Sequence, residues 1–142
     1  MTVQTTTNAA QPRRLWRSAG AIFAGFFAVA VLSVGTDQVL HTLGVYPPWG
    51  EPMHDPKLNL LALAYRVVYT IAGGFIAAWL APRAPVTHAV ILGIIGTVPA
   101  VAGIIATADL DLGPRWFPIA IALTGLPCCW LGGVLYRATQ AD

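Results

Sequence analysis

Four long apolar segments constrain the fold of this chain more than any other feature. They fall at about residues 18–43, 58–81, 87–107 and 116–136. Each has about the 20 residues that an α-helix needs to cross the hydrocarbon core of a bilayer. Backbone polar groups in hydrocarbon must be hydrogen bonded within the segment, which a helix achieves. The sequence therefore predicts an all-α integral membrane bundle of four transmembrane helices.

Composition agrees with a chain that lies mostly in lipid. Only 10% of the residues are charged, against about 25% in soluble domains. Four spans leave room for short connections only, so we expect a single transmembrane domain at 13–142. Residues 1–12 are polar and without apolar periodicity, which predicts a disordered tail. The net charge of +2, with no cluster of basic and aromatic residues, argues against nucleic acid and leaves the lipid bilayer as the expected surroundings.

The basic residues predict the orientation in the membrane. Cytoplasmic segments next to transmembrane helices are enriched in Lys and Arg. Because the four spans alternate in direction, most basic residues outside them fall on one face. That face would be the cytoplasmic one, with both termini on it, and in a bacterium the membrane would be the inner one. A cleaved signal peptide fits less well, because three more spans follow the first. The expected inner residues are Arg13, Arg14, Arg17, Arg83 and Arg137, and the outer ones are Lys57 and Arg115.

A few polar residues stand at membrane depth, where a charge at the helix centre costs roughly 2.5–3.5 kcal/mol. Asp37 and Arg66 are expected to pair, since each would otherwise be an isolated charge. The pair could be a structural contact that fixes the first two helices against each other, or the floor of an outward-facing polar cavity. Residues spaced four apart share a helix face, so Ser33 and His41 are expected beside Asp37. The complete candidate cluster is Ser33, Asp37, His41, Tyr65, Arg66, Tyr69 and Thr70.

The segment Gly44–Lys57 between the first two spans contains four prolines and several aromatic residues. Proline reduces the conformational freedom of a loop. We therefore expect an ordered cap over the outer end of the bundle, with Trp49 packed against the third or fourth helix. The alternative is a rigid spacer whose Trp49 rests among lipid headgroups. Glu51, His54 and Asp55 lack the spacing of metal ligands on one rigid element, which predicts a solvated rim rather than a metal site.

The third and fourth spans each contain a proline near the middle, Pro99 and Pro127. A proline inside a helix removes one backbone hydrogen bond and commonly produces a kink. Paired breaks at the midplane can also mark a transporter binding site. Both spans carry small residues at helical spacing, which allow close helix approach. These are Gly93, Gly96, Ala100, Gly103 and Thr107 in the third span, and Gly125, Cys129 and Gly133 in the fourth.

The second and fourth spans carry similar glycine pairs, Gly73-Gly74 and Gly132-Gly133, ahead of an arginine at the inner face. A parallel repeat of two hairpins is one interpretation. Chance is the other, because Gly is common in membrane helices.

The sequence contains no recognisable nucleophile, cofactor site or metal triad. It therefore favours a non-enzymatic subunit or accessory factor without a cofactor, which contacts a further copy of itself or another membrane protein. The alternative is a small homo-oligomeric transporter or channel with an outward-facing polar cavity at Asp37, His41 and Arg66. A continuous cavity through the bundle would favour transport, and a closed bundle with an exposed small-residue face would favour a subunit.

Overall fold

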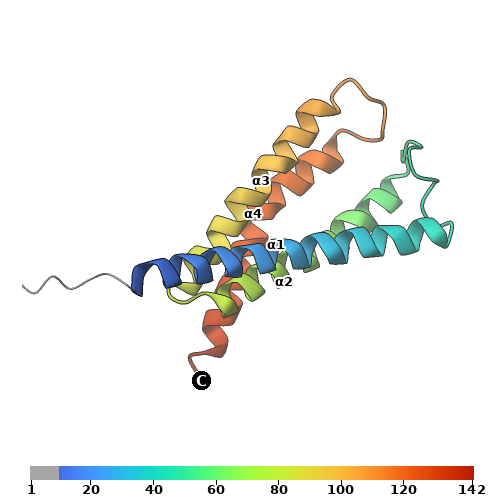
Figure 1. The fold of residues 1–142 in the computed structure, drawn as a ribbon. Coiled ribbons are helices and arrows are strands. Elements are labelled where there is room, and N and C mark those ends of the chain that lie inside the picture. The colour runs from blue at the N-terminus through green and yellow to red at the C-terminus, as the bar shows by residue number, and fades with distance from the viewer. Residues whose placement is uncertain (1–9) are drawn as a thin grey trace, which may run out of the picture.

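A computed structural model describes residues 10–142 as four helices joined by short connections (Figure 1). The helices are α1 (Ala10–Thr42), α2 (Pro56–Leu80), α3 (Pro85–Ala106) and α4 (Trp116–Thr139). Each is long and apolar enough to cross a membrane. The chain is thus an all-α, multi-pass membrane protein with four candidate spans, as the sequence predicts.

Two boundaries differ from the sequence prediction. Helix α1 begins at Ala10, so residues 10–12 of the expected tail belong to a helix, while residues 1–9 lie outside the described part. Pro12 is compatible with this start, because the N–H groups of the first helical turn have no partner within the helix. Helix α4 continues to Thr139, past the expected end at 136, and no Gly or Pro follows Gly133 to stop it.

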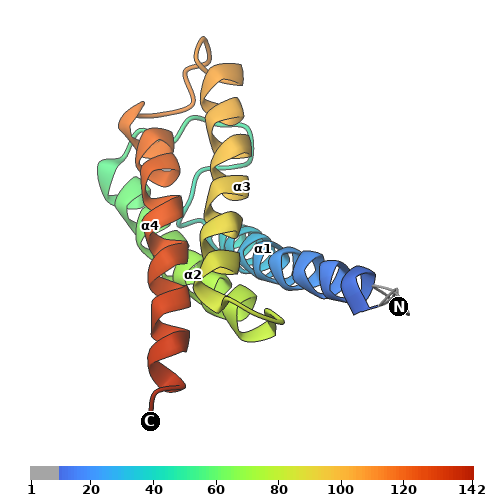
Figure 2. The same ribbon diagram turned by 90° about the vertical axis from the view of Figure 1, so that its left-hand side faces the viewer.

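The helices form two antiparallel hairpins, α1–α2 and α3–α4, that cross at an angle (Figure 1). Figure 2 shows α3 and α4 side by side, while α1 extends away from them toward its N-terminus. Helix α2 lies centrally and packs against the other three, whereas α1 contacts α3 over a short stretch and does not contact α4. One helix is therefore attached to the bundle almost entirely through its hairpin partner.

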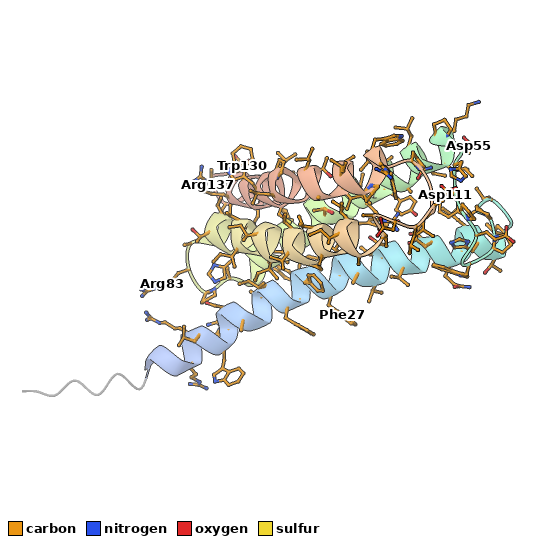
Figure 3. All side chains as sticks on the ribbon, turned by 90° about the horizontal axis from the view of Figure 1, so that it is seen from above. Phe27, Asp55, Arg83, Asp111, Trp130 and Arg137 are labelled. Carbon is orange, nitrogen blue, oxygen red and sulfur yellow. The ribbon has the colours of Figure 1, made fainter. Side chains whose placement is uncertain are left out.

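Small residues form the core and large ones face outward. A Cβ atom on Gly132 would lie 2.1 Å from the carbonyl oxygen of Ile71, and one on Gly74 would lie 2.3 Å from that of Cys129. Such contacts bring α2 and α4 together at backbone distance. Phe27 points away from the bundle (Figure 3), with 58% of its surface exposed. This pattern suits lipid, because lipid tails are as apolar as the large side chains and helices associate through close packing of small residues.

Charge is separated along the bundle. Arg83 and Arg137 lie at the end that also holds the start of α1, and Asp55 and Asp111 lie at the opposite end (Figure 3). We call the end with Asp55 and Asp111 the acidic end.

Candidate functional site

An ion pair between Asp37 of α1 and Arg66 of α2 is the centre of the polar cluster. The Nη2 atom of Arg66 lies 2.5 Å from Oδ2 of Asp37. The side chain of Asp37 is 12% exposed and that of Arg66 is 24% exposed, although both residues stand in apolar helices. The predicted pairing is therefore present. It joins the two helices of the first hairpin near the acidic end.

Two tyrosines complete this network. Tyr65 donates its hydroxyl proton to Oδ1 of Asp37, and its oxygen accepts from Nη1 of Arg66 at 3.1 Å. The hydroxyl of Tyr46, in the loop after α1, lies 3.2 Å from that of Tyr65. Because Tyr65 uses its only proton on Asp37, Tyr46 is the donor in that bond. Both carboxylate oxygens of Asp37 thus accept a hydrogen bond from a neighbouring side chain.

The remaining predicted members lie at its edge. Tyr69 bonds to Thr36 of α1 at 2.8 Å rather than to Arg66. Thr70 donates to the backbone oxygen of Arg66. Both side chains thus bond to partners other than the guanidinium of Arg66. Ser33 is 8% exposed, and its hydroxyl has no hydrogen-bond partner in the described part of the chain.

His41 turns away from the ion pair and toward the loop between α1 and α2. Its Nδ1 donates to the carbonyl oxygen of Pro47 at 2.5 Å. Its ring packs on Trp49 with 4.0 Å between the ring centres, and Trp49 also donates to Gln38 at 3.2 Å. Trp49 therefore rests on α1, not on α3 or α4, and it remains 60% exposed. The predicted contact of Trp49 is wrong, because the loop folds back on its own hairpin at this point.

A different residue of the loop covers the cluster. Tyr46 is buried, at 5% exposure, with its hydroxyl also 3.5 Å from the carbonyl oxygen of Leu58. Burial is the main cause that raises the pKa of Tyr46, so this hydroxyl keeps its proton at neutral pH. Tyr46 therefore occupies the covering position over the polar cluster that the sequence predicts for Trp49.

The end of the loop reaches the second hairpin. The backbone N–H of Met53 donates to the carbonyl oxygen of Leu112 at 2.9 Å, and Asn59 donates to the carbonyl oxygen of Met53 at 2.9 Å. Asn59 is only 2% exposed. His54 and Asp111 lie 3.5 Å apart in an exposed contact. These contacts join the two interhelical loops at the acidic end.

The other predicted loop residues are peripheral. Asp55 caps α2 by accepting a hydrogen bond from the backbone N–H of Lys57 at 2.8 Å. Glu51 is exposed, within a backbone turn in which its N–H donates to Pro48. Within residues 10–142, no three His, Cys, Asp or Glu side chains lie close enough together to hold a metal ion.

A cavity of about 340 Å³ lies beside the ion pair and is lined by residues of all four helices. Asp37 and Arg66 line one end and Leu92 and Cys129 the other, but His41 does not line it. Toward the end with Arg83 and Arg137, α1 and α2 meet at Gly25 and Gly73, at backbone distance. Among the described residues, the lining of the cavity runs from Asp37 and Arg66 to Phe26, Leu92 and Cys129 and does not include Arg83 or Arg137.

The two mid-helix prolines do not interrupt their helices. Helices α3 and α4 each run as one element through Pro99 and Pro127. Neither proline lines the cavity, although Gly96, Ala100 and Gly125 nearby do so. A kink at either proline stays a prediction.

Sequence reasoning missed four residues of this region: Tyr46, Thr36, Gln38 and Asn59. Asn59 carried a usable signal, since it is a lone amide at the start of an apolar segment and must find partners when buried. Thr36 lies one residue from Asp37, off the face that helical spacing selects. Tyr46 could not be assigned, because its position depends on how the loop returns.

The sequence matches no protein-family model, no curated protein and no solved structure.

Proposed function

We propose that this chain is a non-enzymatic subunit or accessory factor of a cell membrane, and that it meets a protein partner through its outer loop. Both termini would lie in the cytoplasm, in the inner membrane of a bacterium. The observation that carries the proposal is the rigid presentation of Trp49. Its ring is exposed, yet it packs on the ring of His41 and donates a hydrogen bond to Gln38.

Preorganisation of this kind favours recognition. A side chain that is already ordered loses less conformational entropy on binding. Exposed Trp residues are also enriched among the residues that dominate protein interfaces. The loop around Trp49 is attached to both hairpins, through Tyr46 and Met53. The partner would therefore meet a surface of fixed shape.

The polar cluster supports a structural role rather than chemistry. Asp37, Arg66 and Tyr65 bond to one another, so each carboxylate oxygen already accepts a hydrogen bond from within the protein. A general acid or base must come within hydrogen-bond distance of the proton that it transfers. The network is better suited to fixing α1 against α2 and holding the loop above them.

Photo-crosslinking in intact cells tests the partner surface. A photoreactive amino acid at Glu51, in the loop, should give a discrete protein adduct, and replacing Trp49 with Ala should abolish that adduct. The matched control is Trp79→Ala, since Trp79 is equally exposed at 61% but stands on α2, away from the loop. Loss of the adduct in both variants, or in neither, contradicts the proposal.

Cysteine labelling tests the orientation separately. In a background with Cys128 and Cys129 replaced by Ala, Glu51→Cys should react with an impermeant reagent in intact cells. Arg83→Cys should react only after the membrane is opened. The reverse pattern would place the termini outside.

A further inference from the structure

The cavity beside the ion pair has the size of a small-ligand site. Its volume is about 340 Å³, and ligand pockets generally run from roughly 300 to 1,000 Å³. A transmembrane helix, about 10 Å across and 30 Å long, would occupy roughly 2,000 Å³ or more. The cavity is therefore too small for a helix of a partner protein.

The lining changes in polarity from one end to the other. Phe26 and Leu92 line the end nearer the middle of the bundle, and Ser33, Asp37 and Arg66 line the end nearer the outer loop. Asp37 and Arg66 are already paired. The hydroxyl of Ser33 is the exception, because it is buried and has no partner among the described residues. A buried hydroxyl without a hydrogen bond is unfavourable, and a ligand acceptor at this end would satisfy it.

The wall of the bundle is incomplete beside this cavity. Helix α1 does not contact α4 and meets α3 over a short stretch only. A close contact between them, Gly25 against the side chain of Leu92, lies at the apolar end of the cavity. Nearer the acidic end, α1 and the second hairpin line the cavity from separate sides. This is the side from which we expect a ligand to enter from the bilayer.

We infer that this cavity binds one acyl chain of a glycerolipid from the surrounding bilayer, with the Ser33 hydroxyl donating to the ester carbonyl oxygen. The chain fills the apolar end, and the ester meets the polar end, in the orientation of a lipid in the leaflet nearer the acidic end. A free fatty acid fits less well. Its carboxylate would add a second negative charge beside Asp37, whose charge Arg66 already balances. The inference does not depend on the proposed partner of the loop.

The probe is a phosphatidylethanolamine with a photoreactive diazirine in the middle of one acyl chain. The protein is reconstituted with this lipid, irradiated, and mapped by mass spectrometry. Labelling is expected at Leu92, which lines the cavity and is only 3% exposed. It should fall at least fivefold in Gly96→Leu, because Gly96 lines the cavity and has open space for a side chain. Gly103→Leu is the matched control, since Gly103 lies on the same helix with equal space but outside the cavity lining.

Labelling of Phe27, which faces the surrounding lipid, should be the same in all variants. Equal labelling of Leu92 in both glycine variants would overturn the inference. Thermal unfolding establishes that each variant is folded. If Gly96→Leu is not, Ala100→Leu takes its place, because Ala100 lines the same cavity.

The role of Ser33 is tested with unlabelled competitors. An ester-linked lipid should compete better than its ether-linked analogue by roughly two- to tenfold, the worth of one hydrogen bond. In Ser33→Ala the two lipids should compete equally. Palmitate should compete less well than the ester lipid in the wild-type protein. A preference for palmitate, or an ester preference that survives in Ser33→Ala, contradicts the assignment.

Discussion

The two hairpins of this protein are held together by different means. In the α1–α2 hairpin, Asp37 and Arg66 form an ion pair supported by Tyr65. In the α3–α4 hairpin, small residues pack closely, with a Cβ on Gly93 only 2.9 Å from the backbone of Leu126. Polar contacts fix which residues face each other, whereas small residues fix how closely two helices approach. The hairpin with the directional contacts is also the one whose connecting loop bonds to the polar cluster, through Tyr46.

The resemblance between the glycine pairs of α2 and α4 does not extend to their contacts. Gly73 faces α1 and Gly74 faces α4, whereas Gly132 faces α2 and Gly133 faces α3. The glycine that faces the hairpin partner is therefore the first of its pair in α2 and the second in α4. A repeat would keep this order. The contacts favour the interpretation that the shared glycines arose by chance.

The junction between the hairpins should be the most sensitive point. In Gly132→Ala, the added Cβ would meet the carbonyl oxygen of Ile71 at 2.1 Å, and backbone atoms cannot rotate away as a side chain can. We expect α2 and α4 to separate, with a loss of about 4 kcal/mol or more through lost packing. Gly103→Ala is the control, since nothing lies within 4 Å of its Cβ position. The measurement is the folded fraction in mild detergent as SDS is added, and equal stability of the two variants would refute close packing at this junction.

Breaking the Asp37–Arg66 ion pair of the first hairpin should have the next largest effect on the free energy of unfolding. Asp37→Asn or Arg66→Gln leaves one partly buried charge without its partner, at a cost of about 3 kcal/mol each. The double variant leaves neither charge, so it should lose much less than the sum of the single losses. The free energy of unfolding of all four proteins provides this comparison. Additive losses would show that the pair does not couple the helices.

Periodicity and charge determined what could be predicted of the fold. The four apolar segments specified the helices, because each is long enough to span a bilayer and is bounded by Pro, Gly or charge. The pairing of Asp37 with Arg66 followed from the cost of isolated charges at membrane depth. The crossing of the hairpins did not follow. It depends on which glycines meet, and the sequence offers several equivalent small-residue faces.

The candidate site was predictable only where it lies on regular helices. Helical spacing placed Ser33 and Asp37 on one face, and both line the cavity. It placed His41 there too, but α1 ends at Thr42, and the loop draws His41 to Pro47 and Trp49. No local pattern encodes where a loop with several prolines returns.

The hydrogen bond from the Tyr46 hydroxyl to Tyr65 should contribute about 1 kcal/mol to the free energy of unfolding, the worth of an ordinary hydrogen bond. Tyr46→Phe keeps the ring and removes that bond. Because burial raises the pKa of Tyr46 above its ordinary value of 10.0, the folded state favours the protonated hydroxyl. This contribution is present below pH 10 and is lost as the pH rises further. The stability difference between wild type and Tyr46→Phe should therefore shrink above pH 10, as thermal unfolding across pH 7–11 would show. A constant difference would mean that Tyr46 does not titrate with unfolding.

The smallest effect is expected where the loops of the two hairpins meet. His54 and Asp111 lie 3.5 Å apart with side chains 59% and 84% exposed, and even a fully charged pair at such exposure contributes only about 0–1 kcal/mol. Asp111→Asn should therefore change the free energy of unfolding by less than about 0.5 kcal/mol.

The backbone contact beside this pair should matter more. Gly113 adopts a φ of 148°, and a Cβ there would lie 2.6 Å from the carbonyl oxygen of Met53. Gly113→Ala should cost about 1–3 kcal/mol, the range for a strained backbone position, and should weaken the bond from Met53 to Leu112. Hydrogen exchange of the Met53 amide measures this directly, with faster exchange expected in Gly113→Ala and unchanged exchange in Asp111→Asn. If Asp111→Asn exchanges faster instead, charge rather than backbone geometry joins the two hairpins at their acidic end.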